Sequence, residues 1–429
     1  MNPVQHRSHC FLCPFHRVYP TYSRNRGNGF RFATNKSSIM KKRLVTYFKN
    51  VFGTLLIVSL LGSIVLIALN GNFNYGHHDK RFDLDNEGPF VFHENDSLMS
   101  INFIKGNKND GFYVDRKFFG KEITPETYSY FALEGSRFDF ELHTEIKPPK
   151  SIYEDEQRII AVSDIESGFR TFRDFLINNK VIDKQLEWTF GKGHLVLVGD
   201  FVDRGFSTTQ VLWFIYKLEQ EALKQGGQVH FILGNHEIKN LQDNFRKAAF
   251  KYHAVADILE RPLSELYGPE SFLGNWMSSK NTMEMINGHL FVHGGIHPEV
   301  AKTKLSLDVI NALIRSKYRH PYYPRPDRTD TQLLIDIRKG PAWYRGYFNG
   351  ELSEVDVNKG LDMFGAEAVI VGHTPQRKVS KLYDGLVFGI DVLHPKDYMD
   401  SFPFKASEGL LIQDGQYFRL LFDGTPIEL

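Results

Sequence analysis

Cysteine is nearly absent from this 429-residue chain, because its two cysteines, Cys10 and Cys13, lie close to the N-terminus. No disulfide can therefore form within the rest of the chain. This excludes a small domain stapled by disulfides and favours a domain that relies on a large hydrophobic core. With His9 and His16 the two cysteines form an H-C-x2-C-x2-H cluster, a weak signal for zinc because no second half accompanies the C-x2-C pair.

Acidic residues are missing from residues 1–50, which hold ten Lys and Arg. The remainder carries 42 basic and 51 acidic residues, a net charge of −9. A nucleic-acid-binding protein places its excess positive charge on the folded domain, so no nucleic-acid partner is expected. Met40 is followed by a short basic segment of the kind that usually precedes a membrane helix, so translation could begin there. Residues 1–39 are then either a short basic tail or the product of a start codon assigned too far upstream.

Charge is also missing from residues 51–69, a run of nineteen residues whose only polar members are Thr54, Ser59 and Ser63. Its length is close to the ~20 residues that a helix needs to cross a bilayer. Basic residues flank it on the N-terminal side. The positive-inside rule then predicts a single-pass membrane protein with a cytoplasmic N-terminus, in which the chain after Asn70 is periplasmic or otherwise exported. A cleaved signal peptide and a buried core helix are the alternatives.

The exported part divides into three segments. Residues 70–87 are rich in Gly, Asn, His and Asp and predict a linker. Residues 88–150 contain alternating and aromatic runs that predict a β-rich lead-in. From residue 151 to 429, strand-like runs alternate with helical patterns, which predicts an α/β domain with some antiparallel strands. Residues 239–272 are expected to be helical and to cover the candidate site described below. Residues 410–422 are expected to form a closing β-hairpin.

Five short apolar runs in this domain each end on residues able to bind a metal. Such runs are typical of buried parallel strands, and sites gather at the carboxyl ends of these strands. The mixture of oxygen and nitrogen donors suits a pair of hard or borderline divalent metals. The pattern therefore predicts one metal cluster built from Asp164, Glu166, Asp200, Asn235, His293 and His373.

Four motifs in order make the chain resemble the calcineurin-like metallophosphoesterases: GDFVDRG at 199–205, GNHE at 234–237, HGG at 293–295 and GHTP at 372–375. The VDRG and GNHE forms resemble the phosphoprotein phosphatase branch of that family. Residues 274–295 and 340–348 resemble its bacterial, Shewanella-like subgroup. The resemblance implies a four-layer α/β/β/α sandwich and hydrolysis of a phosphate ester by a hydroxide that two divalent metals activate.

The resemblance also implies roles for individual residues. Asp200 matches the carboxylate that bridges the metals, with Asp164 and Glu166 on the first ion and Asn235, His293 and His373 on the second. His236 matches the general acid, which Asp203 would hydrogen-bond, and Asn235 and His236 also face the phosphate. Arg204 and Arg345 would bind phosphate oxygens, although Arg345 could instead stack between neighbouring aromatics. Asp391 is either a carboxylate behind the ligands or a strand cap.

Glu166 departs from the family pattern, which has histidine at this position. In one interpretation Glu166 binds the first metal and favours harder ions such as Mn²⁺ or Mg²⁺. Two divalent ions are expected, with Mn²⁺ as the leading candidate and Fe, Zn or Mg as the alternatives. In the other, Glu166 points away from the site and the first metal is held weakly. The protein is then a slow enzyme or a relic that only binds phosphate. The leading function is a membrane-anchored phosphomonoesterase, with a phosphoprotein as one possible substrate. The alternative enzyme is a phosphodiesterase or nucleotide pyrophosphohydrolase.

Overall fold

The computed structural model describes residues 29–69, 71, 73–326, 329–403 and 406–429. The predicted cluster of Cys10, Cys13, His9 and His16 lies outside these residues. The chain divides into two compact units, Met1–Leu69 and Asn70–Leu429, and each is treated by itself.

The described part of the first unit, residues 29–69, is one helix, α1 (Gly29–Ala68). It begins well before the predicted start at residue 51, because the lysines, arginine and leucine between residues 40 and 50 are good helix formers that let the helix continue upstream. Its segment Ser38–Ala68 is long and apolar enough to cross a membrane, a test that a signal sequence near the N-terminus also passes. The hydroxyl of Ser63 donates to the Ser59 carbonyl at 2.8 Å and so stays satisfied within the helix.

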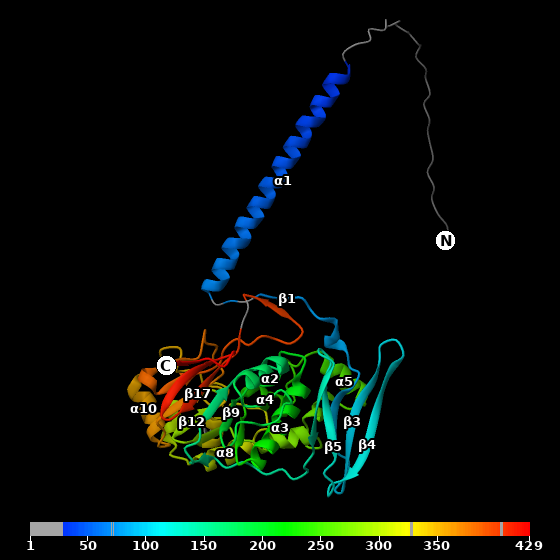
Figure 1. Ribbon diagram of the computed structural model, residues 1–429. Coiled ribbons are helices and arrows are strands. Elements are labelled where there is room, and N and C mark those ends of the chain that lie inside the picture. Colours follow the sequence, from blue (N-terminus) through cyan, green and yellow to red (C-terminus); the bar gives the residue numbers. More distant parts are fainter. Residues whose placement is uncertain (1–28, 70, 72, 327–328, 404–405) are drawn as a thin grey trace, which may run out of the picture. The chain divides into compact units, whose positions relative to one another are not determined.

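Two six-stranded sheets form the centre of the second unit (Figure 1). The first has the order β10 (Gln228–Ile232), β9 (His194–Val198), β8 (Ile159–Val162), β17 (Glu408–Gln413), β18 (Gln416–Leu421) and β19 (Pro426–Glu428). The second has the order β14 (Ser380–Leu382), β15 (Val387–Gly389), β13 (Ala368–Val371), β12 (His289–Val292), β11 (Met283–Ile286) and β7 (Ile152–Tyr153).

Side chains from the facing surfaces of the two sheets pack into one apolar cluster between them. In β8, Ile159 and Ala161 belong to an apolar cluster that also contains Phe291 and Ile370 from the second sheet. The intervening Ile160 belongs to the separate cluster that includes the helices. Because successive side chains point to opposite faces, each of these strands is buried on both sides.

Helices cover the outer faces of the two sheets. On the first lie α2 (Phe169–Asn178) and α3 (Thr208–Lys224), and α3 packs on β10. On the second, α8 (Leu307–Arg315) packs on β11. The remaining helices of this half are α7 (Pro298–Lys302), α9 (Asp330–Leu334), α10 (Glu354–Asp362) and the 3-10 turn η3 (Tyr383–Gly385). The predicted mixed α/β sandwich is confirmed.

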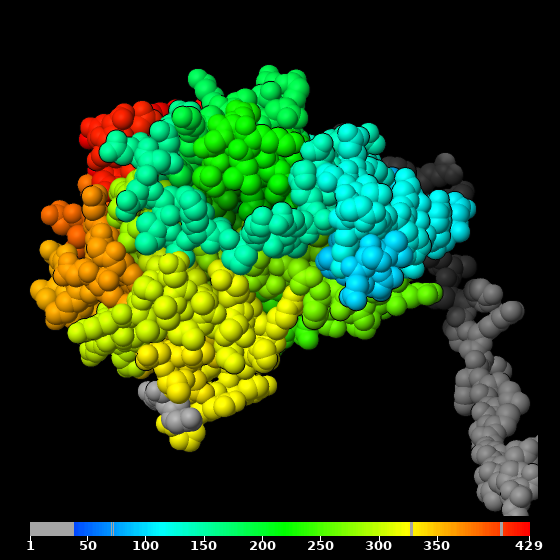
Figure 2. All heavy atoms as spheres, turned by 90° about the horizontal axis from the view of Figure 1, so that it is seen from below, coloured from blue at the N-terminus to red at the C-terminus, as the bar shows by residue number. Residues whose placement is uncertain are grey.

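The lead-in is β-rich, as the sequence predicts. It contains a three-stranded sheet and a separate hairpin, formed by β2 (Glu87–His93), β3 (Leu98–Asn107), β4 (Gly111–Gly120), β5 (Glu126–Phe131) and β6 (Ser136–Glu141). Figure 2 shows this cyan segment lying against the green segment that carries α3. The Trp213 indole donates to the Pro89 carbonyl at 2.8 Å, and Lys251 pairs with Glu87 at 3.1 Å, so polar contacts also hold the lead-in in place.

Two segments differ from their predicted form. The expected linker contains a 3-10 turn, η1 (Asp79–Phe82), and a strand, β1 (Phe73–Tyr75), which pairs with β16 (Asp400–Phe402). The expected continuous helical cap is broken into α4 (Asn235–Leu241), α5 (Lys251–Leu259), η2 (Leu263–Leu266) and α6 (Phe272–Ser279). A strand partner more than 300 residues away leaves no local signal, so sequence patterns miss this pairing.

Candidate active site

The predicted ligand residues follow directly from the ends of five strands. Asp164 follows β8, Asp200 follows β9, Asn235 opens α4 after β10, His293 follows β12 and His373 follows β13. All five side chains are buried. Because these strands bury both faces in the sandwich core, their carboxyl ends hold the five side chains in fixed positions.

Backbone strain is concentrated at the same strand ends. Asp164, Asp200 and His373 have positive φ values of 56°, 57° and 63°, which non-glycine residues rarely adopt. Gly234 approaches the cluster so closely that a Cβ atom there would lie 2.4 Å from Asp200 Oδ1. Strained backbone of this kind persists where the surrounding structure holds it, and it is typical of functional sites.

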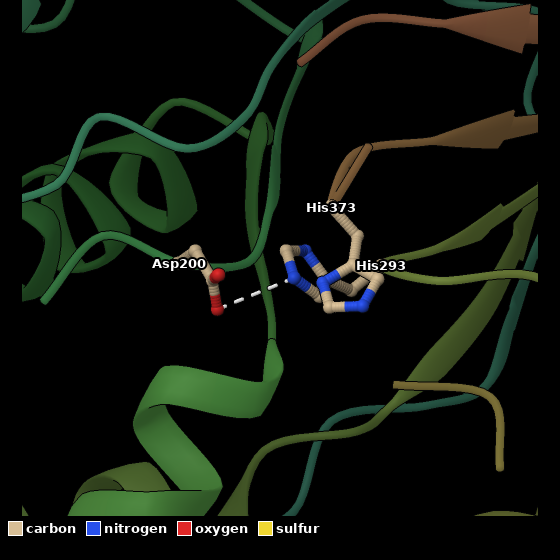
Figure 3. A group of neighbouring side chains, drawn as sticks. All are labelled: Asp200, His293 and His373. Atoms are coloured by element: carbon tan, nitrogen blue, oxygen red, sulfur yellow. Dashed lines mark ion pairs between the residues drawn. The ribbon is translucent and has the colours of Figure 1, made fainter. Parts of the chain in front are cut away.

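Potential metal ligands converge on Asp200 (Figure 3). His293 Nε2 lies 3.2 Å from Asp200 Oδ1 and 3.3 Å from the amide oxygen of Asn235. One ligand atom each from Asp200, His293 and His373 lie within 4.8 Å of one another. Ligands about 2.1 Å from one ion lie roughly 3.0–3.4 Å apart, so these closest separations fit a shared divalent cation.

Asn235 can face this cluster in two ways. One atom of its amide lies 3.1 and 3.0 Å from the two Asp200 oxygens, and the other lies 2.7 Å from Lys239 Nζ. With nitrogen toward Asp200, the amide donates to the carboxylate and accepts from Lys239. With oxygen toward Asp200, acceptor atoms converge as a cation requires. A bound metal therefore selects the second orientation.

Backbone carbonyls set the tautomers of both histidines. His293 Nδ1 lies 2.7 Å from the Val198 carbonyl, and His373 Nε2 lies 3.0 Å from the Trp343 carbonyl. A carbonyl only accepts hydrogen bonds, so each of these nitrogens carries a hydrogen. The lone pairs of His293 Nε2 and His373 Nδ1 are then directed to the cluster, an arrangement typical of metal-binding histidines.

Charges within the cluster oppose one another strongly. Burial, together with the charge of Asp391, raises the pKa of Asp164 well above its usual value. Burial alone would lower the pKa of His293, but the charges of Asp200 and Asp164 outweigh it and raise that pKa to about 9. Burial and the charge of His293 lower the pKa of His373 to about 2. These conflicts would be relieved if a divalent cation were bound, since its charge would offset the carboxylates and favour neutral His293.

His236 lies beside this cluster and is held by a carboxylate. Its Nδ1 is 2.7 Å from Asp203 Oδ2, and the Asn240 amide donates to the other Asp203 oxygen at 3.2 Å. The second ring nitrogen, Nε2, lies 3.9 Å from Asp200 Oδ2. The imidazole therefore presents one nitrogen to the cluster while a buried carboxylate orients the other.

A family model for calcineurin-like phosphoesterases matches residues 157–377, just over half of the chain. The chain belongs to the calcineurin-like phosphoesterase family. The crystal structure of a cold-active protein-tyrosine phosphatase from a psychrophilic Shewanella species is 30% identical in sequence, with a TM-score of 0.70. That similarity covers 80% of this chain and 99% of the Shewanella chain.

Two curated relatives extend the comparison. Shewanella-like protein phosphatase 1 of Plasmodium berghei is 26% identical, over 54% of this chain and 66% of its own length. A symmetrical bis(5'-nucleosyl)-tetraphosphatase of Chromobacterium violaceum is 26% identical, over 38% of this chain and 52% of its own. The chain thus spans about two thirds and about half of these relatives. The Shewanella-like resemblance is confirmed, and the chain is a hydrolase of phosphoester bonds.

Glu166, which stands where the family has histidine, forms ion pairs with two basic side chains. One carboxylate oxygen accepts from the Arg204 guanidinium, and the other accepts from Lys396 Nζ at 2.8 Å. Glu166 lines the same pocket as Asp164 and Asp200. The structure thus places Glu166 at the pocket and accounts for both of its oxygens through ion pairs.

Arg345 lines the same pocket. Its guanidinium donates to the His373 carbonyl and to Thr374 Oγ1, the latter at 3.2 Å. Arg204, the other predicted phosphate ligand, lies 3.1 Å from His236 Nε2 through its NH2 group. Both arginines line the pocket that also contains Asp164 and Asp200, so stacking alone does not describe Arg345.

Several pocket residues carry no sequence signal that identifies them. Lys396 and His394 follow β15 in an irregular loop, and Lys239 lies one turn into α4. Asp391, for which two roles are predicted, lines the pocket, and burial together with the charge of Glu166 raises its pKa to about 8. Asp391, His394 and Lys396 reach the pocket through the path of the loop after β15, which no local pattern encodes.

Glu237 supports the cluster from behind. Its carboxylate accepts hydrogen bonds from the backbone N–H groups of Asp200 (2.9 Å), Phe201 (2.8 Å), Val202 (3.2 Å) and Gly234 (2.9 Å). Four donors that would otherwise be buried without partners are thus satisfied by one side chain. This contact holds together the turns that carry Asp200 and Asn235.

Proposed function

We propose that this protein is a metal-dependent phosphomonoesterase whose substrates are phosphorylated proteins. The observation that carries the proposal is the meeting, in one pocket, of the Asp200 cluster, the His236–Asp203 pair and two arginines. The similarity to a protein-tyrosine phosphatase over 80% of the chain supports a phosphoprotein substrate. Fold alone does not decide the substrate, so the choice rests on these groups and on that likeness.

The donor set fits two divalent metals. Asp164, Glu166 and Asp200 would hold the first, and Asp200, Asn235, His293 and His373 the second. Metals at these positions would polarise the phosphoryl group and acidify a water molecule. Mn²⁺ is the ion that we propose, because oxygen donors outnumber nitrogen donors.

The side chains divide the remaining work. Arg204 and Arg345 would hold two phosphate oxygens, a task suited to planar guanidinium groups. His236 would transfer a proton from Nε2 to the departing oxygen, since its Nδ1 is occupied by Asp203. Asp203 would keep the imidazole in the orientation that this transfer needs.

Activity on a monoester and a diester separates the two enzyme hypotheses. With Mn²⁺ present, we expect the purified protein to hydrolyse p-nitrophenyl phosphate faster than bis(p-nitrophenyl) phosphate, because two arginines match the oxygens of a terminal phosphate. Release of p-nitrophenol measures both rates. Faster turnover of the diester would instead favour the phosphodiesterase alternative, which the similarity to a nucleosyl tetraphosphatase supports.

The helix α1 supports a membrane location. We propose that it spans the bilayer once and that the catalytic unit is exported, because residues 41–43 and Lys49 are basic and no acidic residue precedes the apolar run. Intact cells that express the full chain should then hydrolyse p-nitrophenyl phosphate added outside them. If activity appeared only after lysis, the catalytic unit would lie on the cytoplasmic side and the proposed orientation would be wrong.

Glu166 permits a direct test of the first metal position. If its carboxylate is a ligand, Glu166→His should weaken Mn²⁺ binding by about 10–100-fold and shift the preferred metal toward Zn²⁺, because imidazole is the softer donor. Titration calorimetry with each metal measures this change.

Lys396→Met is the matched control. It removes one ion-pair partner of Glu166 without changing the set of ligands, so the order of metal preference should not change. An unaltered preference in Glu166→His as well would show that Glu166 is only an ion-pair partner of Arg204 and Lys396.

A further inference from the structure

The short ribbon formed by β1 and β16 has two different faces. Phe73 pairs with Phe402, and Asn74 pairs with Ser401, in an antiparallel register. Phe73, Tyr75 and Phe402 are exposed, whereas Asn74 and Ser401 between them are half-buried. Since side chains alternate along a strand, the three aromatics share the outer face with Asp400.

The inner face borders the catalytic pocket. Asn74 lines the pocket that also contains Asp164, Asp200 and His236. The ribbon is therefore part of the wall of the active site. The sequence predicts the segment that contains β1 as a linker, so it gives no sign that β1 borders the pocket.

Three of the four side chains on the outer face are aromatic, and the fourth is the exposed carboxylate of Asp400, which pairs with Tyr75 at the edge of the ribbon. Phe73, Tyr75 and Phe402 are 64%, 49% and 45% exposed, and the rings of Phe73 and Tyr75 stack with centroids 6.3 Å apart. A ribbon of two three-residue strands has little stability of its own in water. Exposed aromatics grouped in this way mark a surface that meets an apolar partner.

Chain connectivity indicates which partner is within reach. The candidate membrane span ends at Ala68, and β1 begins at Phe73. Four peptide steps from Leu69 to Phe73 cover at most about 15 Å, since consecutive Cα atoms are 3.8 Å apart. This limit holds for any orientation of the two units. The ribbon is thus tethered close to the surface of any bilayer that the helix crosses.

We propose that the outer face of the β1–β16 ribbon docks on the lipid bilayer through Phe73, Tyr75 and Phe402, which rests on the proposed membrane span. Aromatic side chains favour the headgroup region, where their rings leave water. The catalytic pocket, which Asn74 of the ribbon helps to line, is then held close to the membrane surface. Phosphate esters presented at the membrane surface become its nearest substrates.

Depth-dependent quenching tests this docking in the full chain. Cys10 and Cys13 are replaced by serine, and Phe402→Cys carries an environment-sensitive fluorophore in phosphatidylcholine vesicles. We expect blue-shifted emission and at least about twofold quenching by nitroxide lipids, because the label enters the interface. Phe73→Cys, labelled in the same way, provides a second position on the same face.

Val309→Cys is the matched control, since Val309 is 43% exposed and lies on α8, at the far end of this unit from β1 in Figure 1. Its label should remain in water. Adding Phe73→Ser to the Phe402 label should reduce quenching, although the tether is unchanged. Water-like emission at both ribbon positions, or quenching that ignores Phe73→Ser, would overturn the docking. Turnover of p-nitrophenyl phosphate by the same proteins reports separately on the proposed function.

Discussion

Asp200→Asn should lower kcat/KM for p-nitrophenyl phosphate by at least about 10³-fold, since metals supply several kcal/mol of transition-state stabilisation and each 1.4 kcal/mol is tenfold in rate. Asp200 is the side chain on which the predicted ligand sets of both metals depend. Its oxygens also lie near His293 and accept from the backbone N–H of His236 at 2.9 Å. Metal content, measured on the same sample, should fall together with the rate.

Glu284→Gln is the matched control for loss of a buried negative charge. Glu284 is buried like Asp200, but its partners are His230 at 2.6 Å and Asn281 at 2.9 Å rather than residues of the cluster. This variant should keep the metal and most of the activity, even if its stability declines. A folded Asp200→Asn protein with nearly normal turnover would show that the cluster is not the catalytic centre.

His236→Gln should have an effect that depends on the leaving group. With phenyl phosphate, whose departing oxygen needs a proton, we expect kcat to fall by about 10²–10⁴-fold, the usual contribution of a general acid. With p-nitrophenyl phosphate the loss should be much smaller, because nitrophenolate leaves without protonation. Rates across a series of substituted phenyl phosphates measure this dependence.

Asp203→Asn gives a companion measurement. It leaves the imidazole in place but weakens the 2.7 Å contact that orients it, so the same dependence on the leaving group should appear in milder form. Equal losses on all substrates in His236→Gln would mean that His236 binds phosphate or supports the fold. Its proposed role as proton donor would then be wrong.

The strand ends are the part of the site that local sequence predicts well. Asp164, Asp200 and His373 each follow a run of buried apolar residues, and a parallel strand brings its C-terminal residue to one edge of the sheet. The order of the motifs along the chain then identifies the family. The α/β alternation and the closing hairpin of β17 and β18 have the same origin, because short-range patterns encode them.

Contacts between distant segments could not be predicted in this way. Lys396 reaches Glu166 across 230 positions, and β1 finds β16 across more than 300. Neither has a periodic signal, since one is a single side chain on a loop and the other a three-residue strand. The start of α1 could not be predicted from its apolar run either. The helix begins at Gly29, upstream of that run, because helix formation continues through flanking residues of good helix propensity.

The amino-acid sequence alone therefore determined the family, the α/β class and the candidate ligands that strand ends carry, because each depends on residues close together along the chain. Tertiary structure decided which cations surround Glu166, how His236 and the two ligand histidines are oriented, and which wall of the pocket bears exposed aromatics. These features arise where segments far apart in sequence meet, and only packing of the whole core brings such segments together.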